Sequence, residues 1–431
     1  MADFNFKKWN LILGWFAFLI AFITYSLTVE PTVSFWDAGE YILTSSKLQV
    51  GHPPGAPFFQ MMGAFFSIFA TDPTQIGLMI NMMSATASAF TILFMFWSIV
   101  LLIKQVVKNN NESSKGQNAA ILGAAFVGSL SFAFTDSFWF NAVETEVYAM
   151  ATLIMAVLFY LGLRWGNDMF TPRGNKWLIL ISFVVGLSFG VHFMGLLTIP
   201  AIGLIYYFKN YKTITVKNFV LANLAGIAVL LFVFKLLAPN ILKYFSALEI
   251  FFVNSVGLPF NSGSIIAFVL LVGFIIFGIR YTRKKNYVNL NTALLCITFV
   301  VVGFSSWLML PIRANANVTV NENNPSSARE LLAYYNLEQY PKTHLFYGPQ
   351  FTDQYAGLDE NQPYVDDKPK YEKDKTIGKY VVVNDFKNGS QNYNSKHASL
   401  LPRMWSSEHA ENYMMYSGFL DFSIKTDYQM Q

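Results

Sequence analysis

Two carboxylates near the N-terminus have a spacing that suits acid–base chemistry. Asp37 and Glu40 lie three residues apart in the segment Ser34-Phe-Trp-Asp-Ala-Gly-Glu-Tyr41, so on a helical turn they share one face. A carboxylate in such a place can act as a general base or position a hydroxyl nucleophile. The spacing alone leaves open the alternative that the pair caps a short helix at a membrane surface and stays solvated.

A histidine follows in the segment Gly51-His-Pro-Pro-Gly-Ala-Pro57. The prolines fix the backbone and remove hydrogen-bond donors, so we expect His52 in a rigid turn. A histidine held there could bind phosphate or a sugar hydroxyl. The alternative is a loop that only redirects the chain.

Two glutamates stand in the segment Trp139-Phe-Asn-Ala-Val-Glu-Thr-Glu-Val-Tyr148, just before a long apolar run. Glu144 and Glu146 are functional candidates, because acidic groups close to hydrocarbon are costly. The alternative is helix capping, since a glutamate at a helix N-terminus interacts favourably with the helix dipole. We expect at least one of the two to serve only as a cap.

Two cationic or titratable residues complete the set of candidates. His192 stands where two short helices are expected to meet, and a buried hydrogen-bonded role is its alternative. Arg313 follows the last apolar run, where an arginine can bind a lipid phosphate through two parallel hydrogen bonds. Snorkelling to ordinary lipid headgroups is the alternative.

The elements that must position these residues are those of a membrane protein. The 431 residues are 54% hydrophobic and 13% charged, against roughly 25% charged in a typical soluble domain. The net charge of +4 reflects basic residues in short loops and does not suggest nucleic-acid binding. No phosphate-binding loop, dinucleotide fingerprint, zinc-protease motif or nucleophile elbow is present. The one cysteine and five scattered histidines lead us to expect neither a disulfide nor a metal or cofactor site.

We expect nine membrane-spanning helices, each crossing with about 20 apolar residues. Their predicted residues are 9–29, 77–103, 119–135, 147–163, 177–193, 194–208, 218–237, 264–280 and 292–311. The stretch 177–208 is divided in two because every basic loop cluster then falls on the side of a cytoplasmic N-terminus, as the positive-inside rule asks. A single long helix there would move the last two clusters outside. Residues 55–70 and 240–256 are expected to be interfacial or re-entrant.

The sequence thus predicts an all-α polytopic membrane domain over residues 1–311. An extracytoplasmic C-terminal region follows over 312–431, polar and rich in Asn and Tyr. This region is long enough for one small α/β or irregular domain. It contains one strand-like run, Tyr380-Val-Val-Val-Asn384.

The motifs together resemble a bacterial multi-pass membrane family, of the kind found in Bacteroidetes and known as a domain of unknown function. The resemblance rests on Trp-Asp-Ala-Gly-Glu-Tyr, Gly-His-Pro-Pro-Gly-Ala-Pro and Glu-Thr-Glu-Val-Tyr. It continues in Ile312-Arg-Ala-Asn-Ala-Asn-Val, Asn321-Glu-Asn-Asn-Pro325, Leu345-Phe-Tyr-Gly-Pro349 and Leu401-Pro-Arg-Met-Trp-Ser406. That family is similar to the transmembrane protein O-mannosyltransferases within the GT-C superfamily of glycosyltransferases.

The resemblance implies a GT-C-like helical bundle that uses a polyprenyl-phosphate-linked sugar and an acceptor on the extracytoplasmic face. It assigns the role of catalytic base to Asp37 or Glu40, with Asp37 preferred. It makes Glu146 the second acidic residue of the active site. His52 and Arg313 become candidates for binding donor phosphate or sugar. Glu144, Tyr148 and His192 are kept as further substrate-binding candidates.

The implied reaction is an inverting transfer of a sugar to a hydroxyl of an exported protein, in a bacterial inner membrane with a periplasmic C-terminal region. Many relatives are expected to be longer, so this chain would be a short form or a fragment that needs an envelope-complex partner. One alternative is a non-catalytic subunit of an envelope or secretion complex. Another is a lipid or solute transporter, which the near absence of charge inside the predicted spans disfavours.

Overall fold

The computed structural model describes residues 5–107, 114–340 and 344–417. The chain forms two compact units. The first comprises Met1–Glu249 and Gly263–Asn336, and the second Ile250–Ser262 and Leu337–Gln431. Residue 311, after which the extracytoplasmic region is expected to begin, lies inside the first unit, and that boundary stays a prediction.

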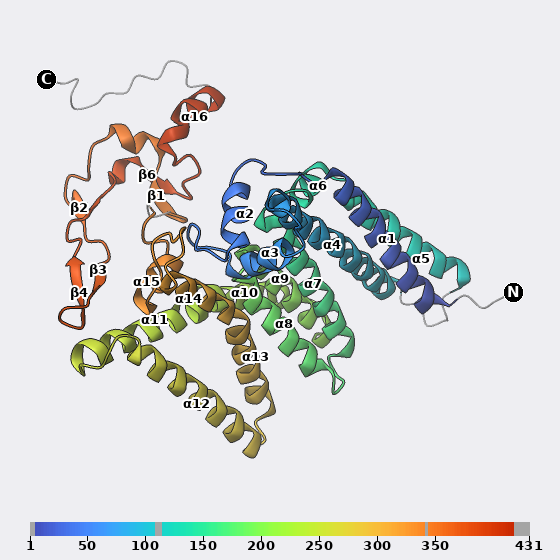
Figure 1. Cartoon of the computed structure of the whole chain (residues 1–431). Coiled ribbons are helices and arrows are strands. Elements are labelled where there is room, and N and C mark those ends of the chain that lie inside the picture. The colour runs from blue at the N-terminus through green and yellow to red at the C-terminus, as the bar shows by residue number, and fades with distance from the viewer. Residues whose placement is uncertain (1–4, 108–113, 341–343, 418–431) are drawn as a thin grey trace. The chain divides into compact units, whose positions relative to one another are not determined.

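The first unit is helical (Figure 1). Its α-helices are α1 (Phe6–Thr28), α2 (Ala38–Ser46), α3 (Pro57–Ser67), α4 (Ile76–Val106), α5 (Lys115–Ala133), α6 (Asp136–Ala142), α7 (Val147–Asp168), α8 (Gly174–Ser188), α9 (Thr198–Asn210), α10 (Val216–Leu231), α11 (Ala238–Ile250), α12 (Ser262–Lys284), α13 (Val288–Phe304), α14 (Met309–Asn315) and α15 (Ala328–Tyr335). Short 3-10 or π-helical segments are η1 (Pro73–Gln75), η2 (Phe193–Leu197), η3 (Phe232–Leu237), η4 (Phe251–Ser255, which belongs to the second unit) and η5 (Ser305–Leu308).

Six helical stretches in the described part of the chain are long and apolar enough to cross a membrane. They are Phe6–Thr28, Pro73–Val106, Val147–Asp168, Val216–Ser255, Ser262–Lys284 and Val288–Asn315. The helices α5 and α6 meet at a bend of 69°, and they add a seventh span if the two together cross the membrane once. The nine predicted spans are therefore not confirmed, although the protein has the apolar helices of a multi-pass membrane protein.

The stretch 177–208 accounts for the difference between nine and seven, and the helix that begins at Val216 differs only in its length. The stretch 177–208 does form two helices, α8 and α9, separated by η2, but each is shorter than a usual crossing. The predicted break after residue 237 is absent, because the helical stretch Val216–Ser255 runs through η3 and η4 for 40 residues.

A close contact between α8 and α13 depends on two glycines. A Cβ on Gly186 would lie 2.2 Å from the Val300 carbonyl oxygen, and one on Gly303 would lie 2.3 Å from that of Phe183. Small residues at such positions let membrane helices approach backbone to backbone. Any side chain at either position would force the two helices apart.

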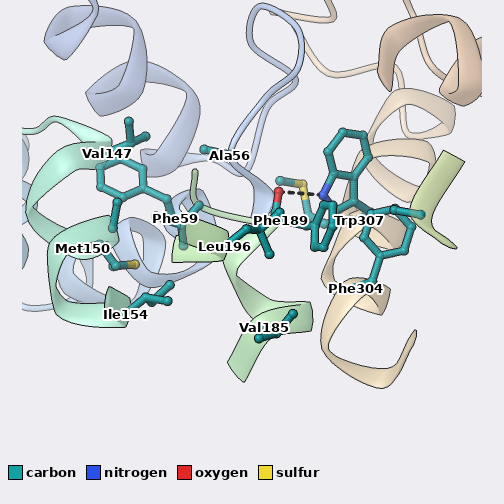
Figure 2. Close-up of a cluster of buried hydrophobic side chains, with 14 of the residues drawn as sticks. Ala56, Phe59, Val147, Met150, Ile154, Val185, Phe189, Leu196, Phe304 and Trp307 are labelled. Carbon is teal, nitrogen blue, oxygen red and sulfur yellow. Dashed lines mark hydrogen bonds between the residues drawn. The ribbon is translucent and has the colours of Figure 1, made fainter. Parts of the chain in front are cut away.

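A large apolar cluster lies beneath the loops that join these helices at one end. It includes Phe59 of α3, Val147 of α7 and Phe189, which follows α8 (Figure 2). Trp307 of η5 packs in the same cluster and donates its indole N–H to the Phe189 carbonyl oxygen at 2.9 Å. Because a buried indole N–H needs a partner, this bond fixes η5 against the end of α8.

The second unit contains a long antiparallel ribbon. Its strands are β1 (Tyr347–Pro349), β2 (Tyr364–Val365), β3 (Lys370–Asp374), β4 (Lys379–Asn384), β5 (Ser390–Gln391) and β6 (Ala398–Leu400). The pairing is nested, with β3 on β4, β2 on β5 and β1 on β6. All three pairs therefore lie on either side of one chain reversal near residue 376. Its remaining elements are η6 (Phe351–Tyr355), η7 (Ser395–His397), η8 (Ser407–His409) and α16 (Ala410–Ser417). The predicted strand at 380–384 is confirmed as β4.

Candidate active site

The first carboxylate of the site precedes a short helix. Trp36 adopts a left-handed backbone conformation with φ of 58°, and Asp37 follows as the N-cap of α2. The Asp37 side chain makes no capping hydrogen bond and is 58% exposed. Its carboxylate is therefore open to a substrate, and the capping alternative does not describe its contacts.

The second carboxylate is engaged by the histidine. Glu40 Oε2 lies 2.9 Å from His52 Nδ1, and Glu40 Oε1 accepts the His52 backbone N–H at 2.6 Å. The other ring nitrogen, Nε2, lies 3.9 Å from Asp37 Oδ2. His52 thus stands between the two carboxylates, bonded to one and close to the other.

These contacts shift the pKa values of both Glu40 and His52. The hydrogen bond from His52 holds the pKa of Glu40 below its ordinary value. The same bond raises the pKa of His52, against the opposing effect of burial. The arrangement favours a cationic imidazole beside a negative carboxylate.

The loop that carries His52 is held in place by distant parts of the chain. The Tyr334 hydroxyl donates to the Gly51 carbonyl oxygen at 2.6 Å, and the backbone N–H of Phe58 donates to the Gly190 carbonyl oxygen at 2.7 Å. A Cβ on Gly51 would lie 2.5 Å from Glu40 Oε1. Glycine at this position is what allows the Glu40 carboxylate to reach His52.

A third carboxylate lies deeper. Glu146 precedes α7 and is 6% exposed, and its Oε1 atom has no hydrogen-bond partner. Burial raises its pKa to about 7, with smaller contributions from the charges of Asp37 and Glu144. This carboxyl group therefore keeps its proton to a higher pH than an ordinary glutamate does.

The neighbouring Glu144 is also buried. Burial raises its pKa, and the charge of Glu30 adds to the effect. Glu146, and not Glu144, occupies the N-cap position of α7, yet its side chain forms no capping hydrogen bond. The expectation that one of the two glutamates only caps the helix therefore finds no support in these contacts.

Asn81 of α4 ties the two acidic loops together. Its Nδ2 atom donates to the carbonyl oxygens of Glu30 at 2.7 Å and Thr32 at 2.8 Å, while its Oδ1 atom accepts the Thr145 hydroxyl. The backbone N–H of Glu30 also donates to the Val143 carbonyl oxygen at 2.9 Å. One buried amide thus fixes the loop before Asp37 against the loop of Glu146.

Two residues that the sequence did not single out complete the surroundings of His52. Residues 320–322 pair with Val50 as a parallel bridge. This places Glu322 near Glu40, whose charge adds to burial in raising the pKa of Glu322. Tyr41 lies with its ring 5.9 Å from that of His52. Neither residue stands in a motif of acid–base spacing, so only the fold reveals its position.

His192 and Tyr148 form a separate pair, with ring centroids 5.4 Å apart. His192 Nδ1 accepts the backbone N–H of Met194 at 3.1 Å, which leaves its other nitrogen as the donor in the neutral ring. Burial lowers the pKa of His192. The pair offers an aromatic face and an N–H donor.

Arg313 is used differently from the expectation. Its Nε donates to the Leu48 carbonyl oxygen at 2.6 Å, and its Nη2 donates to that of Lys47 at 3.0 Å. These carbonyl groups lie at the C-terminal end of α2, where a cation is favourable. The observed contacts are those of a residue that positions α2, and its binding of donor phosphate stays a prediction.

The site thus gathers Asp37 and Glu40 from the start of α2, His52 from the loop after α2 and Glu146 from the segment before α7. Within the described residues, no group of three or more His, Cys, Asp or Glu side chains is arranged to hold a metal ion. The arrangement offers an open carboxylate, a cationic histidine and a largely buried carboxyl group. These are the parts of a general-base reaction at a charged leaving group.

Comparison with known proteins gives two family matches. Residues 37–215 match the N-terminal domain of protein O-mannosyl-transferase TMEM260, a range that begins at Asp37 and includes His52 and Glu146. Residues 341–429 match a family of unknown function, DUF8416. No solved structure matches the chain significantly.

Two curated relatives carry the same name. Protein O-mannosyl-transferase tmem260 of Dictyostelium discoideum is 26% identical over 243 residues, covering 53% of this chain and 28% of the relative. The TMEM260 protein of Mus musculus is 24% identical over 164 residues, covering 38% of this chain and 21% of the relative. The chain therefore spans about a quarter of the length of these relatives. Through the part that carries the acidic site, this chain is related to the transmembrane protein O-mannosyltransferases.

Proposed function

We propose that this protein is a membrane glycosyltransferase that moves a sugar, with mannose the first candidate, from a polyprenyl-phosphate donor to a hydroxyl of an exported protein. The observation that carries the proposal is the convergence of Asp37, His52 and Glu146 within the range related to protein O-mannosyl-transferases. The relatives' names supply the sugar and the protein acceptor.

Asp37 is the proposed general base. It is the exposed carboxylate of the group, whereas Glu40 is bonded twice to His52. Asp37 removes the proton from a serine or threonine hydroxyl as that oxygen bonds to the anomeric carbon. The bond from the anomeric carbon to the phosphate oxygen breaks in the same step, which inverts the configuration.

His52 is the proposed partner of the leaving phosphate. A cationic imidazole stabilises the negative charge that develops on the departing polyprenyl phosphate. Glu40 keeps the ring oriented and charged through its hydrogen bond to Nδ1. No acid need protonate the leaving group, because a phosphate leaves as an anion.

Glu146 is proposed to act mainly in its neutral form. While protonated, it adds no negative charge beside Asp37 or the donor phosphate. Its partnerless oxygen is then available to a hydroxyl of the acceptor or the sugar. Tyr148 and His192 offer a ring face and an N–H donor for the sugar. Arg313 and Glu144 are further candidates for contacts with the substrate.

The membrane setting follows from the donor, whose long hydrocarbon chain keeps its reactive head at the bilayer surface. We place the site on the extracytoplasmic face of a bacterial inner membrane, with the N-terminus in the cytoplasm. The support is the distribution of Lys and Arg, which gather in the loops at the other ends of the helices.

The direct test is transfer by purified protein in lipid vesicles. A radiolabelled polyprenyl-phosphate mannose and a Ser/Thr-rich acceptor peptide are supplied, and label on the peptide is measured. Wild-type protein and Asp136→Asn, which changes an exposed aspartate of α6 outside the cluster, should transfer label. Asp37→Asn should not. Equal transfer by all three proteins would remove Asp37 as the base.

A further inference from the structure

The second unit carries an apolar patch at the end of its ribbon where β1 and β6 meet. Tyr347 pairs with Leu400 across the strands, and the backbone N–H of Leu401 donates to the Phe346 carbonyl oxygen at 2.7 Å. Phe346 is 76% exposed and Leu400 79% exposed. The strand-end patch consists of Leu345, Phe346, Leu400 and Leu401, all of them exposed.

The strand-end patch lacks the charged side chains that β3 and β4 carry beside their exposed Val382 and Val383. The paired strands β3 and β4 carry charged side chains, among them the exposed ion pair of Lys370 and Glu372. Phe346 directly precedes β1, and Leu401 directly follows β6 with a left-handed backbone (φ of 51°). Exposed apolar patches of this kind mark surfaces that bind something.

The same unit is fixed to a connection between membrane helices. Asn254 Nδ2 donates to the Tyr380 carbonyl oxygen at 2.8 Å, and Asn254 Oδ1 accepts the Tyr380 backbone N–H at 2.8 Å. The rings of Phe260 and Tyr380 are also in edge-to-face contact, with centroids 5.1 Å apart. The side chain of Asn254 thus bonds both backbone groups of one β4 residue, as a neighbouring strand would.

These two contacts lie beside the ends of two candidate membrane spans. Asn254 belongs to the end of the apolar helical stretch Val216–Ser255, and Phe260 stands just before the stretch Ser262–Lys284. Both stretches are candidate membrane spans, so the short connection between them must lie at a membrane surface. The part of the ribbon around Tyr380 is bonded to that connection and therefore lies at the same surface.

We propose that the strand-end patch inserts into the lipid bilayer at this surface. Leucine and phenylalanine, the residue types of this patch, favour the hydrocarbon. The adjoining Arg403 is exposed and suits the phosphate layer next to them. The ribbon is thereby held to the membrane at its open end as well as near its turn.

Spin labels can locate the patch in the full-length protein. The sole cysteine, Cys296, is first replaced by alanine, and single cysteines are then introduced as Phe346→Cys, Leu400→Cys and the control Lys387→Cys. Lys387 is an exposed residue between β4 and β5. Each labelled protein is reconstituted in phosphatidylethanolamine–phosphatidylglycerol vesicles after gel filtration has shown that it elutes like the unlabelled protein.

The measurement compares collisions of the label with oxygen, which concentrates in the bilayer, and with a nickel chelate, which stays in water. Labels at Phe346 and Leu400 should collide with oxygen several-fold more than the Lys387 label does, and several-fold less with the chelate. High accessibility to the chelate would show that the patch faces water. Low accessibility to both would show that another protein surface covers it, and either result would overturn the proposal.

Discussion

His52 Nδ1 lies 2.9 Å from Glu40 Oε2, and the backbone N–H of the same histidine donates to the other oxygen of that carboxylate at 2.6 Å. Both oxygens of Glu40 are thus used by one residue twelve positions later. Between these two carboxylates, the double contact leaves Asp37 as the one without a close hydrogen bond, and it favours the cationic form of His52.

The first prediction concerns the charge of His52. Because Glu40 raises the pKa of His52, the imidazole stays cationic to a higher pH, and donor binding should be lost only as the pH rises through that raised pKa. Glu40→Gln should move this loss to lower pH and raise the KM for the donor about tenfold at neutral pH. The measurement is the donor KM between pH 5.5 and 8.5.

Glu322→Gln is the matched control. Glu322 interacts with His52 through its charge but makes no hydrogen bond to its ring, so its substitution should have a smaller effect. Equal shifts in the two variants would show that the hydrogen bond from Glu40 has no special role.

The second prediction concerns Gly51. A methyl group there would lie 2.5 Å from Glu40 Oε1, so Gly51→Ala should push the carboxylate away from His52 and reproduce the pH shift of Glu40→Gln. Gly123→Ala is the control, since nothing lies within 4 Å of its added methyl group. A Gly51→Ala protein with an unchanged pH profile would contradict the assigned contact.

The third prediction concerns the protonation of Glu146. Its pKa in the folded protein, about 7, exceeds the ordinary glutamate value of 4.5, so the stability linked to its proton is full below pH 4.5 and is lost as the pH rises through about 7. The loss amounts to about 3 kcal/mol. Tm should therefore fall between pH 5 and 8 in the wild-type protein.

Glu146→Gln should remove that part of the fall, because glutamine carries no titrating proton. Asp136→Asn should keep the wild-type dependence. The unfolding temperature in detergent, followed across this pH range, checks both. A slope of Tm against pH that is the same in all three proteins would show that Glu146 is ionised throughout.

The fourth prediction concerns Asn81. Asn81→Leu keeps the volume of the side chain but removes its hydrogen bonds to Glu30, Thr32 and Thr145. The cost should be about 1–3 kcal/mol, and transfer should fall further than stability alone explains, because the two acidic loops lose their common support. Asn223→Leu is the control, since the Asn223 amide donates only within its own helix, to Phe219.

The comparison is made at a temperature where both proteins are fully folded by circular dichroism. Under that condition Asn81→Leu should transfer sugar several-fold more slowly than Asn223→Leu. Matching rates would show that Asn81 contributes only to stability.

Local motifs were enough to select the residues that meet at the site. Asp37 and Glu40 were found from a spacing of three, and His52 from the prolines beside it. Hydropathy was enough to identify a membrane protein and the strand β4. What these signals share is that the residues concerned are close in the sequence.

The remaining features depend on long-range contacts. Tyr334 reaches Gly51 across 283 residues, and Glu322 reaches His52 through a bridge to Val50. In the sequence, Asn81 is one polar residue in a predicted apolar helix, and nothing near it in the chain indicates its partners. The number of spans was not recoverable either, because hydropathy does not show that the apolar stretch 177–208 forms two helices, α8 and α9, that are each shorter than a usual crossing.

The most direct test of the account compares glycoproteins from cells that express wild-type protein, Asp37→Asn or Asp136→Asn at equal levels. The account predicts that a defined O-linked glycan is present with wild type and Asp136→Asn and lost with Asp37→Asn, which would also identify the sugar and the acceptor. An unchanged glycan profile with Asp37→Asn would contradict the central claim that this carboxylate is the catalytic base.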